Sequence, residues 1–249
     1  LMCETILETA LRKAEIAGFR VDTLPLDPDD WQVADRNVAV EDQQVLIDIK
    51  FGTKGPEYGT DHGDKIGPLQ TVRMPMKLAL RLHHYRNVER PKALNVAIRK
   101  GTTVQEQKRI RDDAVHLFIN PISGENYTGS RVYDAWRSVP LPQNGWTVHH
   151  GRDFWACSTL WRAMAQHRKL LEDVLNRKLN DDVLAFIKND ALSVIELQIQ
   201  PQLRHVSRET CMVYLQWLGD RFGVSLNLHE SYVESLAAEG GNDAEGDRD

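Results

Sequence analysis

The stretch Leu-Arg-His-Val-Ser-Arg-Glu-Thr-Cys-Met-Val-Tyr, residues 203–214, places a histidine and a tyrosine nine residues apart, at His205 and Tyr214. A short polar turn separates the two side chains. The hydroxyl of a tyrosine ionises at about pH 10, so it is a poor nucleophile at neutral pH unless cations and proton acceptors stabilise its developing charge. If Tyr214 is a nucleophile, such cations must come from elsewhere in the chain.

One source of cations is the segment 147–155, Thr-Val-His-His-Gly-Arg-Asp-Phe-Trp, in which His149 and Arg152 lie three residues apart at the start of an expected helix. Both side chains can face one anion. The amides of a helix N-terminus favour negative charge, and a guanidinium presents a fork that matches two phosphate oxygens. This spacing is common by chance and is weak evidence taken alone.

A second source is Arg12, in the segment Thr9–Ile16. Apolar residues recur at helical spacing from residue 4 to residue 17, and Gly18 then stops the pattern, which predicts one helix over 4–17. Arg12 would project from this helix with Glu15 three residues on. The ordinary interpretation of the pair is a surface i,i+3 ion pair.

The rest of the chain predicts an α+β fold that is mainly helical. Residues 45–50 and 69–74 read as two strands joined by a Gly-rich segment, 51–68, so they predict an antiparallel hairpin with a long, mobile tip. An extended piece is expected at 116–119, and Ser130 is a candidate helix cap. Further helices are expected at 76–85, 129–139, 152–168, 170–179, 181–188 and 193–200.

Composition indicates an ordinary globular protein. The 249 residues are 41% hydrophobic and 27% charged, and no apolar run is long enough to cross a bilayer. The first residues lack a secretory signal, so we expect a cytoplasmic protein without a membrane partner. The three cysteines show no spacing typical of a disulfide framework or a zinc site, and no histidine spacing indicates a metal hydrolase.

The net charge of -5 comes from the C-terminal end. Residues 233–249 hold six acidic residues and one basic residue, so this acidic stretch carries the whole net charge and residues 1–232 are neutral. We expect 233–249 to be a disordered tail. A neutral 1–232 can still present one basic face, so the whole-chain charge does not exclude DNA as a partner.

The order and setting of these motifs resemble the tyrosine recombinases, the family of the phage integrases, over nearly the whole chain. Residues 9–15, followed by Gly-Phe-Arg-Val-Asp at 18–22, are similar to the family's first-arginine box. The Gly-Thr-Lys-Gly turn at 52–55, closed by residues 70–75, is similar to its catalytic hairpin. Residues 149–152 match the HxxR box, and His205 with Tyr214 matches the final histidine and the nucleophile.

The resemblance implies the family's catalytic fold and a DNA strand transferase. Tyr214 would cut double-stranded DNA through a 3'-phosphotyrosine intermediate, without metal or cofactor. Arg12, His149, Arg152 and His205 would stabilise the phosphate, with Glu15 in a supporting role. Lys54 would be the general acid; the neighbouring candidates are Lys50 and Lys65. A tetramer on paired DNA sites is implied as well.

The chain departs from the family's pattern in two places. The interval between Arg152 and His205 holds 52 residues, which points to a helical insertion at about 170–190 within a catalytic domain spanning 1–232. The family's N-terminal core-binding domain has no counterpart here, so we expect an excised catalytic fragment.

Two alternatives stay open: a type IB topoisomerase-like enzyme, and a catalytically silent DNA-binding module. The motifs do not distinguish integration, excision and resolution, or identify the DNA site, the role of the insertion or the oligomeric state without DNA. Of the biological roles, integration by a mobile element is the one we expect.

Overall fold

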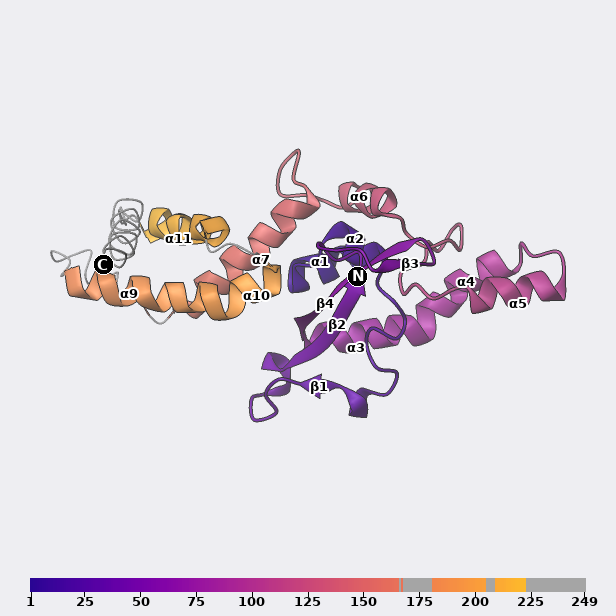
Figure 1. Ribbon diagram of the computed structural model, residues 1–249, viewed down its shortest axis with the longest axis horizontal. Helices are drawn as coiled ribbons and strands as arrows, with labels where there is room; N and C mark the ends of the chain where they lie inside the picture. Colours follow the sequence, from indigo (N-terminus) through magenta and orange to yellow (C-terminus); the bar gives the residue numbers. More distant parts are fainter. Residues whose placement is uncertain (166, 168–180, 205–208, 223–249) are drawn as a thin grey trace, which may run out of the picture. The chain divides into compact units, whose positions relative to one another are not determined.

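A computed structural model describes residues 1–165, 167, 181–204 and 209–222 (Figure 1). The chain's internal contacts divide it into two compact units. The first holds residues 1–156 and 201–204, and the second holds the described residues of 157–200 and 205–249. The described residues form an α+β structure with mostly helices and one small antiparallel sheet, which confirms the predicted fold class at this level.

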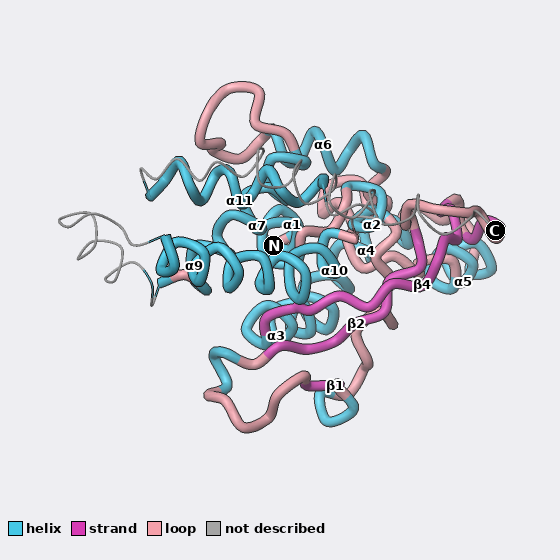
Figure 2. Tube along the Cα trace, turned by 60° about the vertical axis from the view of Figure 1, so that its left-hand side comes forward, coloured by secondary structure: helices cyan, strands magenta, loops and turns pink. Residues whose placement is uncertain are grey.

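The sheet of the first unit has four strands in the order β1-β2-β4-β3, and β2 and β4 run side by side as its two long members (Figure 2). Alternation in β2 buries Val45, Ile47 and Ile49, as the predicted strand requires. The predicted hairpin is confirmed, although its tip contains a further short strand. The strands are β1 (Gln32–Val33), β2 (Gln44–Phe51), β3 (Gly59–Asp61) and β4 (Asp64–Pro75).

A β-bulge separates the regular part of the hairpin from its tip. Ile49 pairs with Gln70, whereas Phe51 pairs with Ile66, so the register of β2 against β4 shifts between these positions. Pro68 lies in this interval, where a missing backbone N–H costs no ladder hydrogen bond. A bulge bends the strands locally, and here it lies where the tip of the hairpin begins.

Up to residue 163 the chain forms seven α-helices in addition to the strands. The expected helix at 76–85 is present as α3, and a π-helical turn, Tyr85–Glu89, joins it to α4 without a break. Helix α5 was not predicted, and the cap of α6 is Thr128, whose hydroxyl accepts from the Arg131 amide, instead of Ser130. The helices are α1 (Met2–Thr9), α2 (Lys13–Ala17), α3 (Met76–His84), α4 (Arg90–Ile98), α5 (Val104–Asp112), α6 (Gly129–Arg137) and α7 (Val148–Ala163).

The single helix predicted over 4–17 is wrong, because the chain breaks between α1 and α2. Ala10 has a left-handed backbone, with φ 55°, and its side chain is fully buried. Long-range contacts stabilise the break: the carbonyl of Thr9 accepts from Gln202 Nε2 at 2.8 Å, and the carbonyl of Ala10 accepts from Arg152. Helix periodicity reports only local contacts, so it could not predict these partners.

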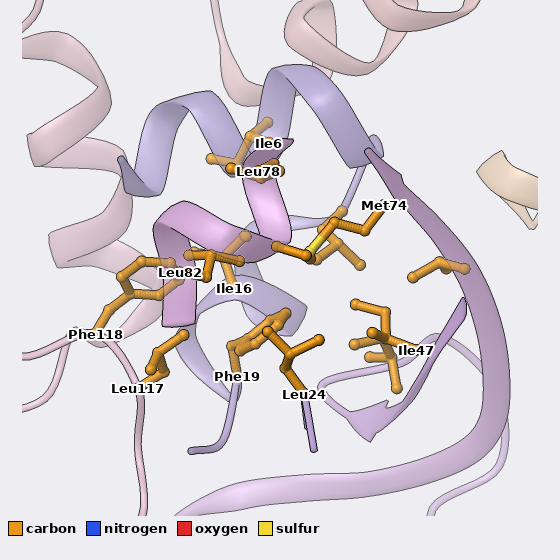
Figure 3. Close-up of a cluster of buried hydrophobic side chains, with 14 of the residues drawn as sticks. Ile6, Ile16, Phe19, Leu24, Ile47, Met74, Leu78, Leu82, Leu117 and Phe118 are labelled. Carbon is orange, nitrogen blue, oxygen red and sulfur yellow. The ribbon is translucent and has the colours of Figure 1, made fainter. Parts of the chain in front are cut away.

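The core of the first unit lies between the sheet and the helices (Figure 3). Ile47 and Met74 from the sheet, Leu82 from α3, and Phe19 and Phe118 from connecting segments pack in one cluster. Burial of such side chains stabilises a fold by about 1.5 to 3 kcal/mol each relative to exposure. This cluster fixes α2 and the hairpin in one rigid framework.

The second unit is helical in its described part. Helix α9 (Asp181–Val194) continues into a π-helical turn (Ile195–Ile199), so the helices expected at 181–188 and 193–200 are parts of one run. Helix α10 (Gln200–Leu203) has its last three residues in the first unit. Helix α11 (Glu209–Phe222) buries Leu215 and Leu218. The helix expected at 170–179 and the tail 233–249 lie outside the described residues. No helix in the described ranges is long and apolar enough to span a membrane.

Candidate functional site

The side chains of Arg12 and Arg152 converge on one atom, the carbonyl oxygen of Leu203. Arg12 Nη2 lies 3.1 Å from this oxygen and Arg152 Nη2 lies 2.8 Å from it. Arg12 directly precedes α2, and Arg152 lies on α7, 140 residues further along the chain. The fold therefore brings two of the predicted cations together, beside the residues that lead to His205.

The two arginines also cap helix ends. Leu203 is the last residue of α10 and Ala10 follows α1, and the carbonyls of both residues accept hydrogen bonds from Arg152. The last carbonyls of a helix lack intrahelical donors and carry partial negative charge, so guanidinium groups satisfy them. A donor set that fits a carbonyl in this way fits the charged oxygen of a phosphate more strongly.

A buried carboxylate and a third guanidinium complete the cluster. The side chain of Glu15 is 0% exposed, its Oε1 accepts from Arg12 Nη1 at 3.0 Å, and its Oε2 lies 2.5 Å from Arg204 Nη2. The expected Arg12–Glu15 pair is thus present but is not a surface pair. Burial lowers the pKa of Arg204 to about 10, Glu15 opposes this shift, and Arg12 adds to it by repulsion. Glu15 therefore forms ion pairs with two guanidinium groups, those of Arg12 and Arg204.

Gln202 attaches this segment to the sheet. Its Nε2 donates to the carbonyl of Arg73 at 2.8 Å, and its Oε1 accepts from the amide of the same residue at 2.9 Å. Arg73 lies on β4, and Gln202 is buried. These hydrogen bonds continue the ladder of β4 onto a side chain, so residues 201–204 keep a fixed position relative to β4 and α1.

The base of the hairpin packs against the start of α2. Gly52 has φ +71°, and a Cβ at this position would lie 2.4 Å from the Ala14 carbonyl oxygen and 2.8 Å from the Glu15 amide nitrogen. Only glycine combines this backbone conformation with so close an approach. The predicted lysine hairpin and the Arg12–Glu15 segment are therefore neighbours in the first unit.

Substitution of Gly52 by alanine should lower the free energy of unfolding by about 3 kcal/mol, because it adds overpacking against α2 to the strain of a positive φ. Gly63→Ala is the matched control, since Gly63 has φ +83° but open space around its Cβ position. The control should lose about 1 kcal/mol from strain alone. Urea unfolding followed by circular dichroism measures both, and equal losses would mean that the hairpin base does not press on α2.

The three lysines considered for the general acid differ in their partners. Lys65 Nζ donates to the Gly55 carbonyl at 2.8 Å, and Lys50 Nζ lies 5.1 Å from the centroid of the Phe51 ring. Lys54 is exposed in the turn after β2 and has no hydrogen-bond or ion-pair partner among the described residues. Of the three ammonium groups, that of Lys54 is the one without a protein contact among the described residues.

Of the remaining predicted residues, His149, His205 and Tyr214, only His149 belongs to the first unit. His149 is exposed in the first turn of α7, and the neighbouring His150 accepts from the Thr147 amide through Nδ1 at 2.9 Å, which caps the helix. His205 lies outside the described residues. Tyr214 belongs to the second unit, on α11, where it is 4% exposed.

Comparison with known proteins supplies no relative. No family model, curated protein or solved structure matches the chain. Within the described ranges, no group of three or more His, Cys, Asp or Glu side chains is placed to hold a metal ion.

Arg204 is the member of the cluster that the sequence analysis did not select. The sequence offers one signal for it, a basic residue directly before His205. No spacing rule links Arg204 to Glu15, which lies 189 residues away in the sequence.

Proposed function

We propose that this chain is the catalytic domain of a DNA strand-transfer enzyme of the tyrosine recombinase type. The observation that carries the proposal is the convergence of Arg12 and Arg152 on the Leu203 carbonyl. The two arginines belong to separate sequence motifs, 140 residues apart in the chain. Their meeting at Leu203 is what a phosphate site built from those motifs requires.

In the proposed reaction the Tyr214 hydroxyl loses its proton to water and its oxygen attacks a DNA phosphorus in line. The bond from phosphorus to the 5'-oxygen breaks, a 3'-phosphotyrosine forms, and Lys54 gives the leaving 5'-oxygen its proton. Arg12 and Arg152 neutralise charge on the non-bridging oxygens, with His149 and His205 as further donors. The 5'-hydroxyl of a partner strand reverses the attack, so the energy of the phosphodiester bond is kept and no nucleotide cofactor is consumed.

The proposed reaction requires two changes from the arrangement seen in the structure. Tyr214 is 4% exposed, so its hydroxyl must become accessible before it can attack DNA. The donors of Arg12 and Arg152 that face Leu203 must exchange a carbonyl for a phosphate oxygen. We also propose that the protein acts as a tetramer on paired DNA sites, in the cytoplasm, for a mobile element.

Covalent trapping on nicked suicide duplexes tests the proposal. The wild-type chain should give protein-linked DNA on a denaturing gel, and Tyr214→Phe should give none because the phenolic oxygen is the nucleophile. Tyr58→Phe is the control, since Tyr58 is 66% exposed in the hairpin tip and should leave the adduct unchanged. Mass spectrometry of the linked peptide identifies the attached residue.

The alternatives give different results in the same experiment. Relaxation of a supercoiled plasmid that carries no special site would favour a topoisomerase-like enzyme. Binding of the duplex by wild type without any adduct would favour a silent DNA-binding module. An adduct on a residue other than Tyr214 would refute the assignment of the nucleophile.

A further inference from the structure

Arg204 has a backbone conformation that an arginine rarely adopts. Its φ is 55°, directly after the last residue of α10, and its amide donates to the Pro201 carbonyl at 3.1 Å. A left-handed residue at this place after a helix is usually glycine, because a Cβ makes the conformation unfavourable. An arginine here needs compensating contacts from its side chain.

The side chain of Arg204 is directed into the arginine cluster. It is 5% exposed, its Nη2 lies 2.5 Å from Glu15 Oε2, and its Nη1 donates to the Gln202 carbonyl at 2.9 Å. Burial of a charged group is costly unless it is paired and hydrogen-bonded; these contacts satisfy both terminal nitrogens, whereas Nε is buried without a hydrogen-bond partner among the described residues. The guanidinium is thus committed to Glu15 and to its own helix end.

Glu15 divides its two oxygens between Arg12 and Arg204. Oε1 accepts from Arg12 Nη1 at 3.0 Å, whereas Oε2 accepts from the Arg12 amide at 2.7 Å and from Arg204. With Oε2 occupied, only one carboxylate oxygen binds the guanidinium of Arg12. The second terminal nitrogen of Arg12 therefore remains directed at Leu203.

We infer that Arg204 is a positioning residue for Arg12: by holding Oε2 of Glu15, it keeps the Arg12 guanidinium directed at the site where a phosphate would bind. The inference deepens the proposed function and depends on it for its catalytic consequence. Without Arg204, Oε2 loses its charged partner in a buried environment. Glu15 then binds Arg12 through both oxygens, as carboxylates do with arginine, and draws Nη2 away from Leu203.

Arg204→Gly removes the side chain at a position whose backbone suits glycine, so the variant should stay folded. At saturating DNA, its adduct formation should be roughly 10- to 100-fold slower, the size of effect that displacement of a reacting group by an ångström produces. The half-saturating DNA concentration should change less than about threefold, since Arg204 binds Glu15 and not the phosphate. A role in folding alone would not produce this split.

Two further variants test the route through Glu15. Arg204→Lys keeps the charge without the planar fork and should restore part of the rate. In a double-mutant cycle, Glu15→Gln combined with Arg204→Gly should cost much less than the product of the two single effects, because both changes break one interaction. Independent, multiplicative effects would overturn the inference.

A crystal structure of the full-length Arg204→Gly variant tests the inference without any activity. We expect Glu15 to bind Arg12 through both oxygens and the Arg12 Nη2 atom to leave the Leu203 carbonyl. An Arg12 guanidinium that stays in place would overturn the inference even if wild type cleaves DNA. Conversely, a displaced Arg12 in a chain whose wild type forms no adduct would support the positioning role while refuting the proposed function.

Discussion

Replacing Arg152 with alanine is expected to slow the formation of protein-linked DNA by about 10² to 10³ at saturating DNA, the cost of removing one preorganised donor from a transition state. Arg152 is 3% exposed, and its second terminal nitrogen is 2.8 Å from the Leu203 oxygen. The desolvated surroundings make its charge more effective there than at the surface.

The same substitution removes a donor from the carbonyls of Ala10 and Leu203. A buried acceptor left unsatisfied costs about 1 to 3 kcal/mol, so Arg152→Ala should also lower the free energy of unfolding. Rates must therefore be compared at a temperature where circular dichroism shows both proteins folded. Arg162→Ala is the matched control, because Arg162 is an exposed residue of α7 whose Nε donates to Ser158 within its own helix.

The two outcomes for Arg152 separate a structural from a chemical role. A variant that is destabilised but, when folded, cleaves DNA as fast as wild type would restrict Arg152 to capping helix ends. A loss of rate in Arg162→Ala of the same size would show that the assay responds to any change on α7. Only a specific loss in Arg152→Ala supports the phosphate assignment.

Arg86→Met should lower the free energy of unfolding by about 4 kcal/mol, at the upper end of single-substitution effects. Arg86 lies in the π-helical turn after α3 and is 6% exposed. Its guanidinium donates to four carbonyls of the segment 21–26 at 2.5 to 3.1 Å, those of Val21, Leu24, Pro25 and Leu26. Methionine fills much of the volume but leaves these acceptors without a donor.

Arg81→Met is the control for this prediction, because it makes the same change on α3, where Arg81 is 48% exposed and pairs with Glu4. An exposed ion pair contributes about 0 to 1 kcal/mol, so the control should stay close to wild type. Urea titrations of the two variants and wild type give the comparison. Similar stabilities for both variants would mean that the loop 21–26 does not depend on Arg86.

The sequence predicted the parts of the fold that depend on local patterning. Alternation in 45–50 predicts β2. The helix predicted over 152–168 is present as α7, but it begins at Val148 and ends at Ala163, so it includes His149 as well as Arg152. Helix α5 has few apolar residues, so periodicity did not predict it. The Thr103 hydroxyl caps its start, and the partly buried Ile110 packs it against the cluster of Ala93, Leu94, Ile98 and Ile119.

The sequence predicts several residues of the candidate site but not how they are arranged. Arg12 and Glu15 were expected on one long helix, but the break at Ala10 places Arg12 before α2 and buries Glu15. Arg204 was missed because its significance comes from Glu15, far away in the sequence. The roles of Lys54, His205 and Tyr214 remain predictions that the trapping experiment tests.

Local sequence is therefore enough to specify the hairpin, most helices and the identity of Arg12 and Arg152 as candidate cations, because periodicity and spacing act between residues close in the chain. The break after α1, the close packing of Gly52 on α2 and the meeting of three arginines at Glu15 and Leu203 come from contacts between distant segments. Such contacts satisfy carbonyls and charges that become buried only when the chain folds, so local sequence patterns do not reveal them.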